Sequence, residues 1–193
     1  MIVVVEGPSA AGKTTWCTRH APRWLPEPGR WSMEEILQYQ VERWRKAVAA
    51  DEQGETIVLD GDPFKLYFNW AMWRAGLSSE AEWKAASGAA RRSVAAGDLG
   101  LADLILYSYP GVDELRRRKE SDPTRARRNF ARNTAMRTSF REWYQCVGRL
   151  DPDRVIWEHP ADGLDERHLR LGRRSNRSSV ATVDALLASL PRT

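Results

Sequence analysis

Residues 2–15 read IVVVEGPSAAGKTT, and this stretch decides the fold. Its first four residues form a β-branched apolar run, which predicts a fully buried strand. Residues 7–14 then match the pattern G-x-x-x-x-G-K-[ST] in full, between that strand and a predicted helix over residues 13–20. Because this pattern binds phosphate when it joins a strand to a helix, the sequence predicts a phosphate-binding loop.

Each part of this loop has an expected role in binding a nucleoside triphosphate. The glycines let backbone N–H groups converge on phosphate oxygens, and the helix N-terminus supplies partial positive charge. Lys13 is expected to reach the β- and γ-phosphates, and the Thr14 hydroxyl is expected to bind Mg²⁺. The predicted nucleotide-binding residues are Gly7, Ser9, Ala10, Ala11, Gly12, Lys13, Thr14 and, at the α-phosphate, Thr15.

Apolar strands that alternate with helices extend the prediction to the rest of the chain. Strands are expected over residues 56–60, 101–107 and 155–157, and helices over 33–50, 64–75, 79–96, 124–150 and 180–190, with an arginine-rich helix after Pro110. Continuously apolar strands have no solvated side, which favours a mostly parallel sheet covered by helices on both faces. We therefore predict a single domain over residues 1–193 with a three-layer α/β fold.

Composition argues against several classes of protein. The chain is 42% apolar and 29% charged, which is ordinary for a globular protein and unlike a disordered one. No apolar run approaches the roughly 20 residues that cross a bilayer. The apolar start also meets Glu6 too early for a signal peptide, so we expect a cytoplasmic protein with no membrane partner. Two cysteines and three histidines without ligand spacing predict neither a disulfide framework nor a zinc site.

An aspartate ends the second predicted strand. In a parallel sheet Asp60 emerges at the same carboxyl edge as the phosphate loop, where open α/β folds bind ligands. Its carboxylate is a candidate base for an attacking hydroxyl and a candidate ligand of Mg²⁺, and the sequence leaves both roles open. Asp62 could share either role or bind the acceptor. The alternative is that residues 60–63 only turn the chain and cap a helix.

The segment after that turn, residues 64–75, is rich in aromatic side chains. The chain has nine tryptophans, more flat surfaces than packing alone requires, so Trp70 and Trp73 are candidates for stacking on a planar or apolar acceptor. The competing interpretation places both rings in the core. Lys65 is a further candidate for the acceptor site. Arg91 could bind an anionic group of the acceptor or occupy an exposed helix face.

Positive charge is concentrated between residues 116 and 141, where ten Lys or Arg residues stand against two acids. The first part of this stretch straddles a helix break, an arrangement suited to a lid over residues 113–130. Arg116, Arg125 and Arg128 are the candidates for neutralising charge on a transferring phosphoryl group. A solvated helix face is one alternative. A nucleic-acid patch is another, disfavoured because only one aromatic ring is close in sequence.

With these residues in place, the chain resembles the P-loop small-molecule kinases. It is similar to the thymidylate and deoxynucleoside kinase group, and chloramphenicol phosphotransferases are another similar branch. A strand of the type D-L-I-x-Y-L in that group, followed by a proline-containing loop and an arginine-bearing helix, has its counterpart in residues 102–107, Pro110 and Arg116. The resemblance implies a five-stranded parallel sheet, a lid, Asp60 as base or metal partner, and a loop near residues 159–162 close to the adenine.

One departure from that group bears on the acceptor. Nucleotide kinases of this type carry Asp-Arg or Glu-Arg after the second strand, whereas Gly61 and Asp62 follow Asp60 here. A second acid would repel a phosphorylated acceptor, so an uncharged or cationic molecule with a hydroxyl fits better. Nucleosides, sugars and hydroxylated natural products such as antibiotics all meet that description.

The sequence as a whole predicts a kinase that transfers a phosphoryl group from ATP or GTP, with Mg²⁺, to a small-molecule hydroxyl. An alternative from another class is a nucleic-acid-associated P-loop ATPase, whose basic stretch would contact the phosphate backbone. A binding-only protein with a degenerate site is disfavoured, because Gly12, Lys13 and Thr14 are all intact.

Overall fold

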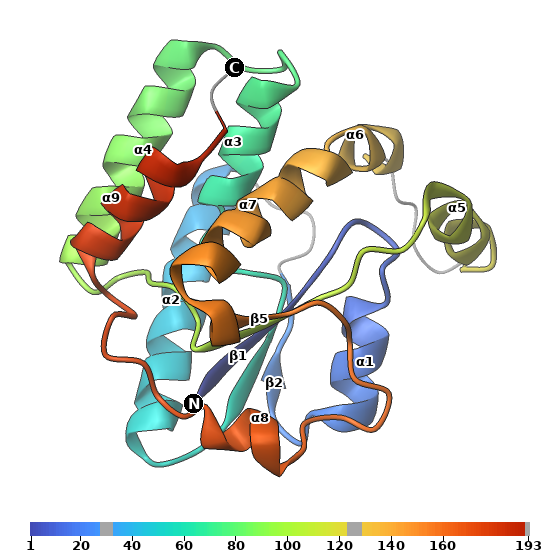
Figure 1. The fold of residues 1–193 in the computed structure, drawn as a ribbon, viewed down its shortest axis with the longest axis vertical. Helices are drawn as coiled ribbons and strands as arrows, with labels where there is room; N and C mark the ends of the chain where they lie inside the picture. The colour runs from blue at the N-terminus through green and yellow to red at the C-terminus, as the bar shows by residue number, and fades with distance from the viewer. Residues whose placement is uncertain (28–32, 123–128, 192–193) are drawn as a thin grey trace.

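Five parallel strands form the centre of the structure (Figure 1), a computed structural model that describes residues 1–27, 33–122 and 129–191. The strands are β1 (Ile2–Glu6), β2 (Trp24–Leu25), β3 (Ile57–Asp60), β4 (Leu104–Tyr107) and β5 (Val155–Ile156). Their order across the sheet is β2-β3-β1-β4-β5, and every pairing is parallel. The predicted parallel α/β sheet is therefore confirmed.

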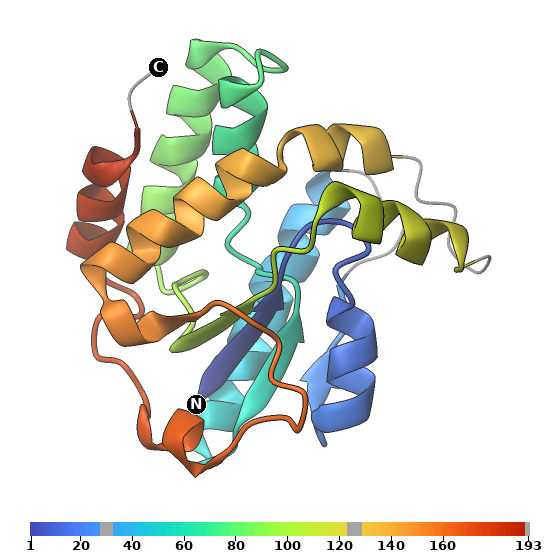
Figure 2. The ribbon, with the colours of Figure 1, turned by 45° about the vertical axis from the view of Figure 1, so that its right-hand side comes forward.

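Helices cover both faces of this sheet. They are α1 (Lys13–His20), α2 (Met33–Glu52), α3 (Leu66–Arg74), α4 (Glu80–Ala95), α5 (Val112–Glu120), α6 (Phe130–Ala135), α7 (Arg137–Leu150), α8 (Glu166–Arg170) and α9 (Val180–Ser189). One face packs against α1, and the other packs against α2 and α7. Figure 2 shows α3, α4 and α9 grouped beyond α7, well away from α1. The three-layer arrangement follows.

Side chains of β1 alternate between two separate cores. Its even-numbered apolar residues pack in the same cluster as Trp44 of α2 and Trp143 of α7, whereas its odd-numbered residues pack with Trp16 and Cys17 of α1. Successive residues of a strand point to opposite faces of the sheet. The unbroken apolar run is thus what a strand needs when both of its faces are covered.

Strand β2, like the short helix α8, is an element that the sequence analysis missed. It is two residues long and lies between Pro22 and Pro26, and proline interrupts regular structure. It pairs in parallel with β3, Trp24 with Val58 and Leu25 with Leu59. The residues after it leave the sheet at its carboxyl edge, where the phosphate loop also begins.

The prediction of one continuous helix over residues 124–150 is wrong for the part that the structure describes. Helices α6 and α7 are separated at Met136, where the backbone ψ of −3° interrupts the helical path. Neither glycine nor proline marks this break, which therefore follows from packing. Phe130 of α6 packs in a small cluster beside the phosphate loop, whereas Phe140 of α7 packs in the main core.

Acidic side chains at the amino edge of the sheet are tied to arginines. Asp103, just before β4, accepts hydrogen bonds from the backbone N–H of Ile2 at 2.7 Å and of Arg174 at 2.8 Å. Arg177 bridges Asp103 to Asp51 at the end of α2, with Nη1 donating to Asp51 Oδ2 at 2.8 Å. Asp51, Asp103 and Arg177 are all buried. This network joins α2, β1 and β4 to the segment before α9.

No helix in the described part of the chain combines the length and the apolar character that a membrane crossing requires.

Candidate active site

The phosphate loop joins β1 to α1, and its backbone is tightly constrained. Gly7 has a φ of 152°, and a Cβ at this position would lie 2.6 Å from the carbonyl oxygen of Ser108, so only glycine fits there. Gly12, the N-cap of α1, has a φ of 93°, in the region that glycine adopts most readily. Ala10 also has a positive φ, of 72°, which is uncommon for a residue with a side chain.

The loop opens onto a cleft of about 1250 Å³. Phosphate-loop residues 7–15 line it together with side chains from α2, α3, α6 and α7, among them Gln40, Tyr67, Phe68, Arg132 and Phe140. The Phe68 and Phe140 rings stack with centroids 6.0 Å apart and an angle of 23° between their planes. The cleft therefore combines a phosphate-binding end with an aromatic wall.

Lys13 lies at the start of α1 with its ammonium group over the phosphate loop. Its Nζ donates to the carbonyl oxygen of Gly7 at 2.8 Å and lies 3.5 Å from Glu6 Oε1. Burial would lower the pKa of Lys13, but the carboxylates of Glu6, Glu27 and Asp60 outweigh it and raise that pKa. Lys13 is thus positively charged, and its ammonium group is fixed by Gly7 and Glu6 at the position where the predicted phosphates would bind.

The side chains of Thr14 and Asp60 form a hydrogen-bonded pair near Lys13. The Thr14 hydroxyl donates to Asp60 Oδ2 at 2.6 Å, while Asp60 Oδ1 is buried and has no hydrogen-bond partner among the described residues. Burial raises the pKa of Asp60, against the opposing effects of the Thr14 hydrogen bond and the Lys13 charge. Hydroxyl and carboxylate oxygens are the donors that Mg²⁺ prefers, and a buried oxygen without a partner fits a cation at this position.

Asp62 does not line the cleft, contrary to its predicted role in acceptor binding. It is buried, its Oδ1 accepts from the Phe64 N–H at 2.9 Å, and its Oδ2 accepts from the Tyr144 hydroxyl at 3.0 Å. Burial and the neighbouring Glu6 carboxylate raise the pKa of Asp62 to about 7. The structure therefore places Asp62 below the wall of the cleft, in a buried network.

Glu6 is the centre of that network, and the sequence analysis gave it no role. Its Oε1 accepts from the N–H of Gly7 at 2.7 Å. Its Oε2 accepts from the N–H of Asp62 at 2.9 Å and from the Tyr67 hydroxyl at 3.1 Å. Glu6 thus connects the phosphate loop to the turn after β3 and to the aromatic wall of the cleft.

A second residue that the sequence analysis missed is Glu27. It follows β2 at the carboxyl edge of the sheet and lines the cleft, with its side chain 40% exposed. Lys65 Nζ donates to its Oε1 at 2.7 Å. Burial opposes ionisation, but Lys65, Lys13 and Arg43 lower the pKa of Glu27 to about 2, so it is a carboxylate at neutral pH.

The turn after β3 leaves room for that carboxylate. A Cβ on Gly61 would lie 3.1 Å from the Glu27 carboxylate, and the φ of Gly61 is 77°. A side chain at position 61 would therefore push against Glu27 as well as strain the turn. The signal that could have revealed Glu27 is the one that identified Asp60, an acid at the end of a strand, but β2 is too short to stand out.

Among the residues predicted for the acceptor site, only Lys65 lines the cleft. Trp70 is fully buried and its ring packs against Trp143 at 6.1 Å, so α3 uses this ring to pack on α7. Trp73 stacks on Trp83 of α4 at 5.9 Å, nearly parallel. The rings of α3 that reach the cleft are those of Tyr67 and Phe68 instead.

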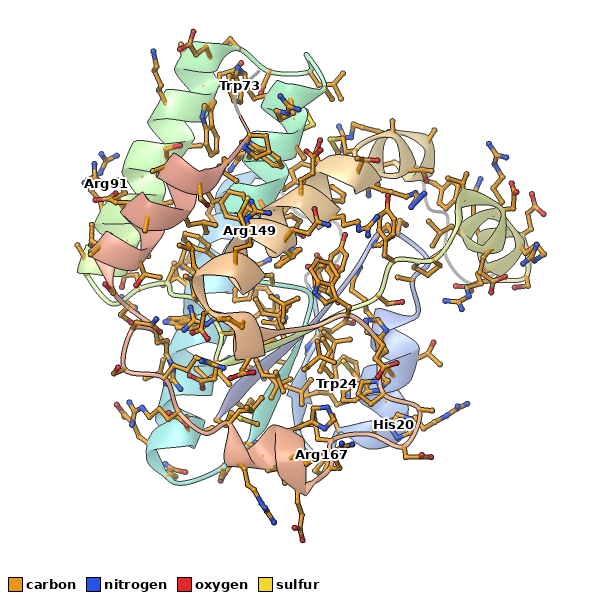
Figure 3. All side chains as sticks on the ribbon, viewed as in Figure 1. His20, Trp24, Trp73, Arg91, Arg149 and Arg167 are labelled. Carbon is orange, nitrogen blue, oxygen red and sulfur yellow. The ribbon has the colours of Figure 1, made fainter. Side chains whose placement is uncertain are left out.

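Arg91 also lies away from the cleft. Its Nε lies 2.7 Å from Asp184 Oδ1 of α9, on the outside of the molecule. Figure 3 shows Trp73 and Arg91 on the α3 and α4 side of the structure, opposite the side that carries His20 of α1. The structure thus assigns Arg91 the exposed-face alternative, because its position on α4 points it toward α9.

The arginine-rich lid is not confirmed. Arg116 of α5 is exposed, pairs with Asp113 at 3.3 Å and does not line the cleft, while Arg125 and Arg128 lie outside the described residues. Two other arginines lie closer to the predicted phosphate site. Arg118 Nη1 donates to the carbonyl oxygen of Ala11 at 3.0 Å, and Arg132 lines the cleft.

The loop after β5 lies against the phosphate loop and α1. His159 Nε2 is 2.9 Å from the carbonyl oxygen of Glu6, which only accepts, so the ring nitrogen donates. Burial lowers the pKa of His159, which favours the neutral ring. The indole N–H of Trp16 donates to the carbonyl oxygen of Pro160 at 2.7 Å. These contacts bring residues 159–160 beside the phosphate loop and α1.

No protein-family model matches the chain, and no curated protein matches it in sequence. Its fold matches solved structures of deoxyadenosine kinase from M. mycoides. The structure with bound dATP matches with a TM-score of 0.60 and 11% identity, over 86% of this chain and 90% of that chain. The chain has the fold of a P-loop kinase.

Two further structures of the same enzyme match at similar levels. The one with the products dCMP and a flexible dCDP has a TM-score of 0.57 and 11% identity, and the one with dCTP has a TM-score of 0.53 and 12% identity. Both matches cover 97% of each chain. The predicted resemblance to deoxynucleoside kinases is thus confirmed for the fold.

Proposed function

We propose that this chain transfers the γ-phosphoryl group of ATP or GTP to the hydroxyl group of a small molecule, with nucleosides as the leading acceptor class. One observation carries the proposal. The phosphate loop with Lys13 and the ionised carboxylate of Glu27 line the same cleft. The matching structures support nucleosides, because deoxyadenosine kinase is a nucleoside kinase by name and was solved with deoxynucleotides bound.

The donor end of the cleft is assigned to the phosphate loop. Backbone N–H groups and the N-terminus of α1 would bind the phosphates, and Lys13 would contact the β- and γ-phosphates. Thr14 and Asp60 would hold Mg²⁺, which neutralises charge on the phosphate oxygens when it is bound. Arg118 and Arg132 join Arg125 and Arg128 as candidates for the remaining charge on the phosphoryl group.

The base in this proposal is Glu27, and Asp60 is the metal partner. Asp60 is buried, does not line the cleft and is engaged by Thr14. Glu27 is half-exposed, faces the cleft and is ionised. Phosphoryl transfer depends mainly on positioning and charge neutralisation, so the first task of this carboxylate is to hold the acceptor hydroxyl in line with the γ-phosphate.

Lys65 would also control the strength of Glu27 as a base. In the structure its ammonium group holds the carboxylate at 2.7 Å and lowers its pKa. A hydroxyl that takes over this position would weaken the Lys65 contact, raise the pKa of Glu27 and make it a stronger base. The ammonium group would remain close enough to offset charge near the acceptor.

Mass spectrometry of candidate acceptors tests the proposed function. Nucleosides, sugars and hydroxylated antibiotics are incubated with the protein, ATP and Mg²⁺, and each is examined for the mass of an added phosphoryl group. The gain should occur on one acceptor class and disappear with Lys13→Ala. Lys84→Ala is the matched control, because Lys84 is an exposed lysine on α4 that pairs only with Glu80 among the described residues.

Two results would contradict the proposal. One is transfer that survives Lys13→Ala. The other is the absence of transfer to any compound, together with ATP hydrolysis that DNA or RNA stimulates and that weakens steeply with salt. The second result would favour the nucleic-acid-associated ATPase.

A further inference from the structure

A groove beside α7 and β5 lies outside the cleft described above. It measures about 490 Å³, which is within the range of sites that bind small molecules. Within the described part of the chain, no residue lines both the groove and the cleft. The residues that line the groove come from α7 and from the segments on either side of β5: Arg141, Gln145, Gly148, Arg149, Pro152 and Trp157.

The groove lies on the opposite side of the sheet from α1. Val155 of β5 packs in the core that includes α2 and α7, whereas Ile156 packs against the core that includes α1. Because successive residues of a strand alternate between the two faces, Trp157 is directed to the α7 side. There its ring contacts that of Tyr107 at 5.5 Å in a T-shaped arrangement. The groove is therefore separate from the phosphate loop and its helix.

Three arginines of α7 have uncharged partners in the described structure. Arg137 and Arg141 both lie over the ring of Tyr109, with their Cζ atoms 4.0 and 4.9 Å from its centroid. Arg137 also donates to a backbone carbonyl oxygen at 3.5 Å. Arg149, which Figure 3 shows on α7, donates from Nη2 to the sulfur of Cys146 at 2.8 Å. These contacts hold the guanidinium groups in place without neutralising them.

Helix α5 shows what α7 lacks. Each arginine of α5 pairs with an acid three or four residues before it. Helix α7 has a single acid, Glu142, and none of its arginines stands three or four residues away from it. Like charges four residues apart destabilise a helix, so the neighbours Arg137 and Arg141 carry a cost that no acid of α7 offsets. An anion beside Arg141 would offset it.

A glycine within α7 adds to the open space of the groove. Gly148 lies inside the helix, where glycine is less favourable than alanine. A Cβ at this position would meet Val155 at 3.7 Å, an ordinary contact, so packing does not require glycine there. Gly148 lines the groove, and a side chain would take space from it. The choice of glycine thus favours an open groove over a more stable helix.

Trp157 gives the groove a flat apolar surface. It is 45% exposed although its ring contacts buried Tyr107. An exposed indole ring is a stacking surface for planar rings, and arginine is the side chain best suited to bind phosphate oxygens. Gln145 adds an amide that can both donate and accept. A ligand that combines a planar ring with a phosphate group would therefore use Trp157 as well as Arg141 and Arg149.

We propose that this groove is a second binding site, which takes a molecule of mononucleotide size that carries a planar ring and a phosphate group. Arg141 and Arg149 bind the phosphate oxygens, and Trp157 stacks on the ring. The site does not use the phosphate loop and does not depend on the proposed phosphoryl transfer. Since no acid lines the groove in the described structure, binding there does not require Mg²⁺.

Isothermal titration of the full chain with ADP counts the sites. The unaltered protein should bind two molecules of ADP per chain, and the one in the groove should remain when EDTA removes Mg²⁺. Arg141→Gln combined with Arg149→Gln should weaken the groove site by at least about tenfold and leave the site at the phosphate loop. Trp157→Ala should weaken the groove site by about tenfold, the effect of one lost stacking contact.

Two further variants separate the groove from general effects of charge and from the phosphate loop. Arg167→Gln combined with Arg170→Gln removes the same charge from exposed arginines near α8 that pair with acids, so both sites should remain. Lys13→Ala should weaken only the site at the phosphate loop. Loss of nucleotide binding at the phosphate loop and loss of binding in the groove are therefore distinct results.

Adenosine and inorganic pyrophosphate test the two halves of the groove. Each offers only the ring or only the phosphates, so each should bind the groove more weakly than ADP does. Equal binding of ADP and of either half would contradict the proposed pairing of ring and phosphate.

Several results would overturn the inference. They are one ADP per chain in the unaltered protein, a second site that survives in the folded double variant of Arg141 and Arg149, or loss of that site in the control of Arg167 and Arg170. Arg141→Gln alone provides the test if circular dichroism shows that the double variant does not fold. A single-stranded oligonucleotide that binds the groove when ADP does not would assign it to nucleic acid and also overturn the inference.

Discussion

Carboxylates lie at both edges of the parallel sheet, and Asp103 at the amino edge differs from Asp60 at the carboxyl edge in how its oxygens are paired. At the amino edge, both oxygens of Asp103 accept hydrogen bonds, and Arg177 ties it to Asp51. At the carboxyl edge, one oxygen of Asp60 has no partner among the described residues, and Glu27 reaches the cleft. The fully paired carboxylate of Asp103 joins parts of the fold, whereas the unpaired buried oxygen of Asp60 is suited to binding a ligand.

The pKa shifts follow the same division. Burial opposes the ionisation of Asp51, but the hydrogen bonds and charge of Arg177 lower its pKa. Burial dominates at Asp60 and Asp62 and raises both pKa values. The ionised Asp51 thus adds to stability, whereas Asp60 and Asp62 reduce stability when they are ionised.

The largest expected effect is on turnover at the carboxyl edge. Glu27→Gln should lower kcat by about 10²–10⁴-fold, because it removes the proposed base while leaving the phosphate loop intact. Nucleotide affinity should hardly change. Steady-state kinetics and a nucleotide titration measure both quantities. Glu55→Gln is the control, because Glu55 is an exposed acid just before β3 at the amino edge.

A second substitution decides which carboxylate is the base. Asp60→Asn should weaken Mg²⁺-dependent nucleotide binding, since it replaces the proposed metal partner. If Asp60→Asn instead lowers kcat alone and Glu27→Gln leaves kcat within tenfold, the two roles are exchanged.

At the amino edge the expected effect is on stability. Arg177→Met leaves Asp51 and Asp103 buried beside each other without their shared cation, which should cost about 3–5 kcal/mol in the free energy of unfolding. Urea denaturation measures this loss, and kcat of the folded protein should be unchanged. Arg167→Met, at an exposed arginine of α8 (Figure 3), should have almost no effect. A fall in kcat with unchanged stability would contradict the division between the edges.

The pH dependence of stability should reveal Asp62. Its pKa is about 7 in the folded protein against 3.8 ordinarily, so the folded chain keeps a proton that the unfolded chain releases. Stability is therefore lost as pH rises from about 4 to about 7, by at most about 1.4 kcal/mol per pH unit. Asp62→Asn should abolish this loss in denaturation measured at pH 5 and pH 8. An identical pH profile for the variant and for the exposed control Asp153→Asn would contradict the assignment.

The smallest effect should come from a residue away from both edges. Arg91→Ala removes one exposed ion pair with Asp184, which should change stability by less than about 1 kcal/mol. The KM for the acceptor should be unchanged, because Arg91 does not line the cleft. A rise in KM would restore Arg91 to the acceptor site.

The sheet and its phosphate loop could be predicted from the sequence because their signals are local. A β-branched run before G-x-x-x-x-G-K-[ST] places a strand, a turn and a helix without reference to distant residues. The five-stranded sheet was implied only by the resemblance, since the two residues of β2 carry too little pattern to be recognised.

The acceptor site could not be predicted as well, because it depends on which faces of the helices are covered. Trp70 and Phe68 both lie on α3, but packing against α7 buries the first and leaves the second in the cleft. Glu27 gains its surroundings from Lys65, which is distant in the sequence and comes close only when the chain folds. Composition and spacing do not report such contacts.

The break at Met136 has a consequence for changing this protein. Phe130 of α6 belongs to a small apolar cluster with Ala10, Ala11 and Leu115 that is separate from the two cores of the sheet. Residues of α6 that line the cleft can therefore be substituted with little effect on the packing of the two cores of the sheet. Under the proposed function, substitutions within residues 129–135 are therefore a way to change the choice of acceptor while the sheet and its two cores stay the same.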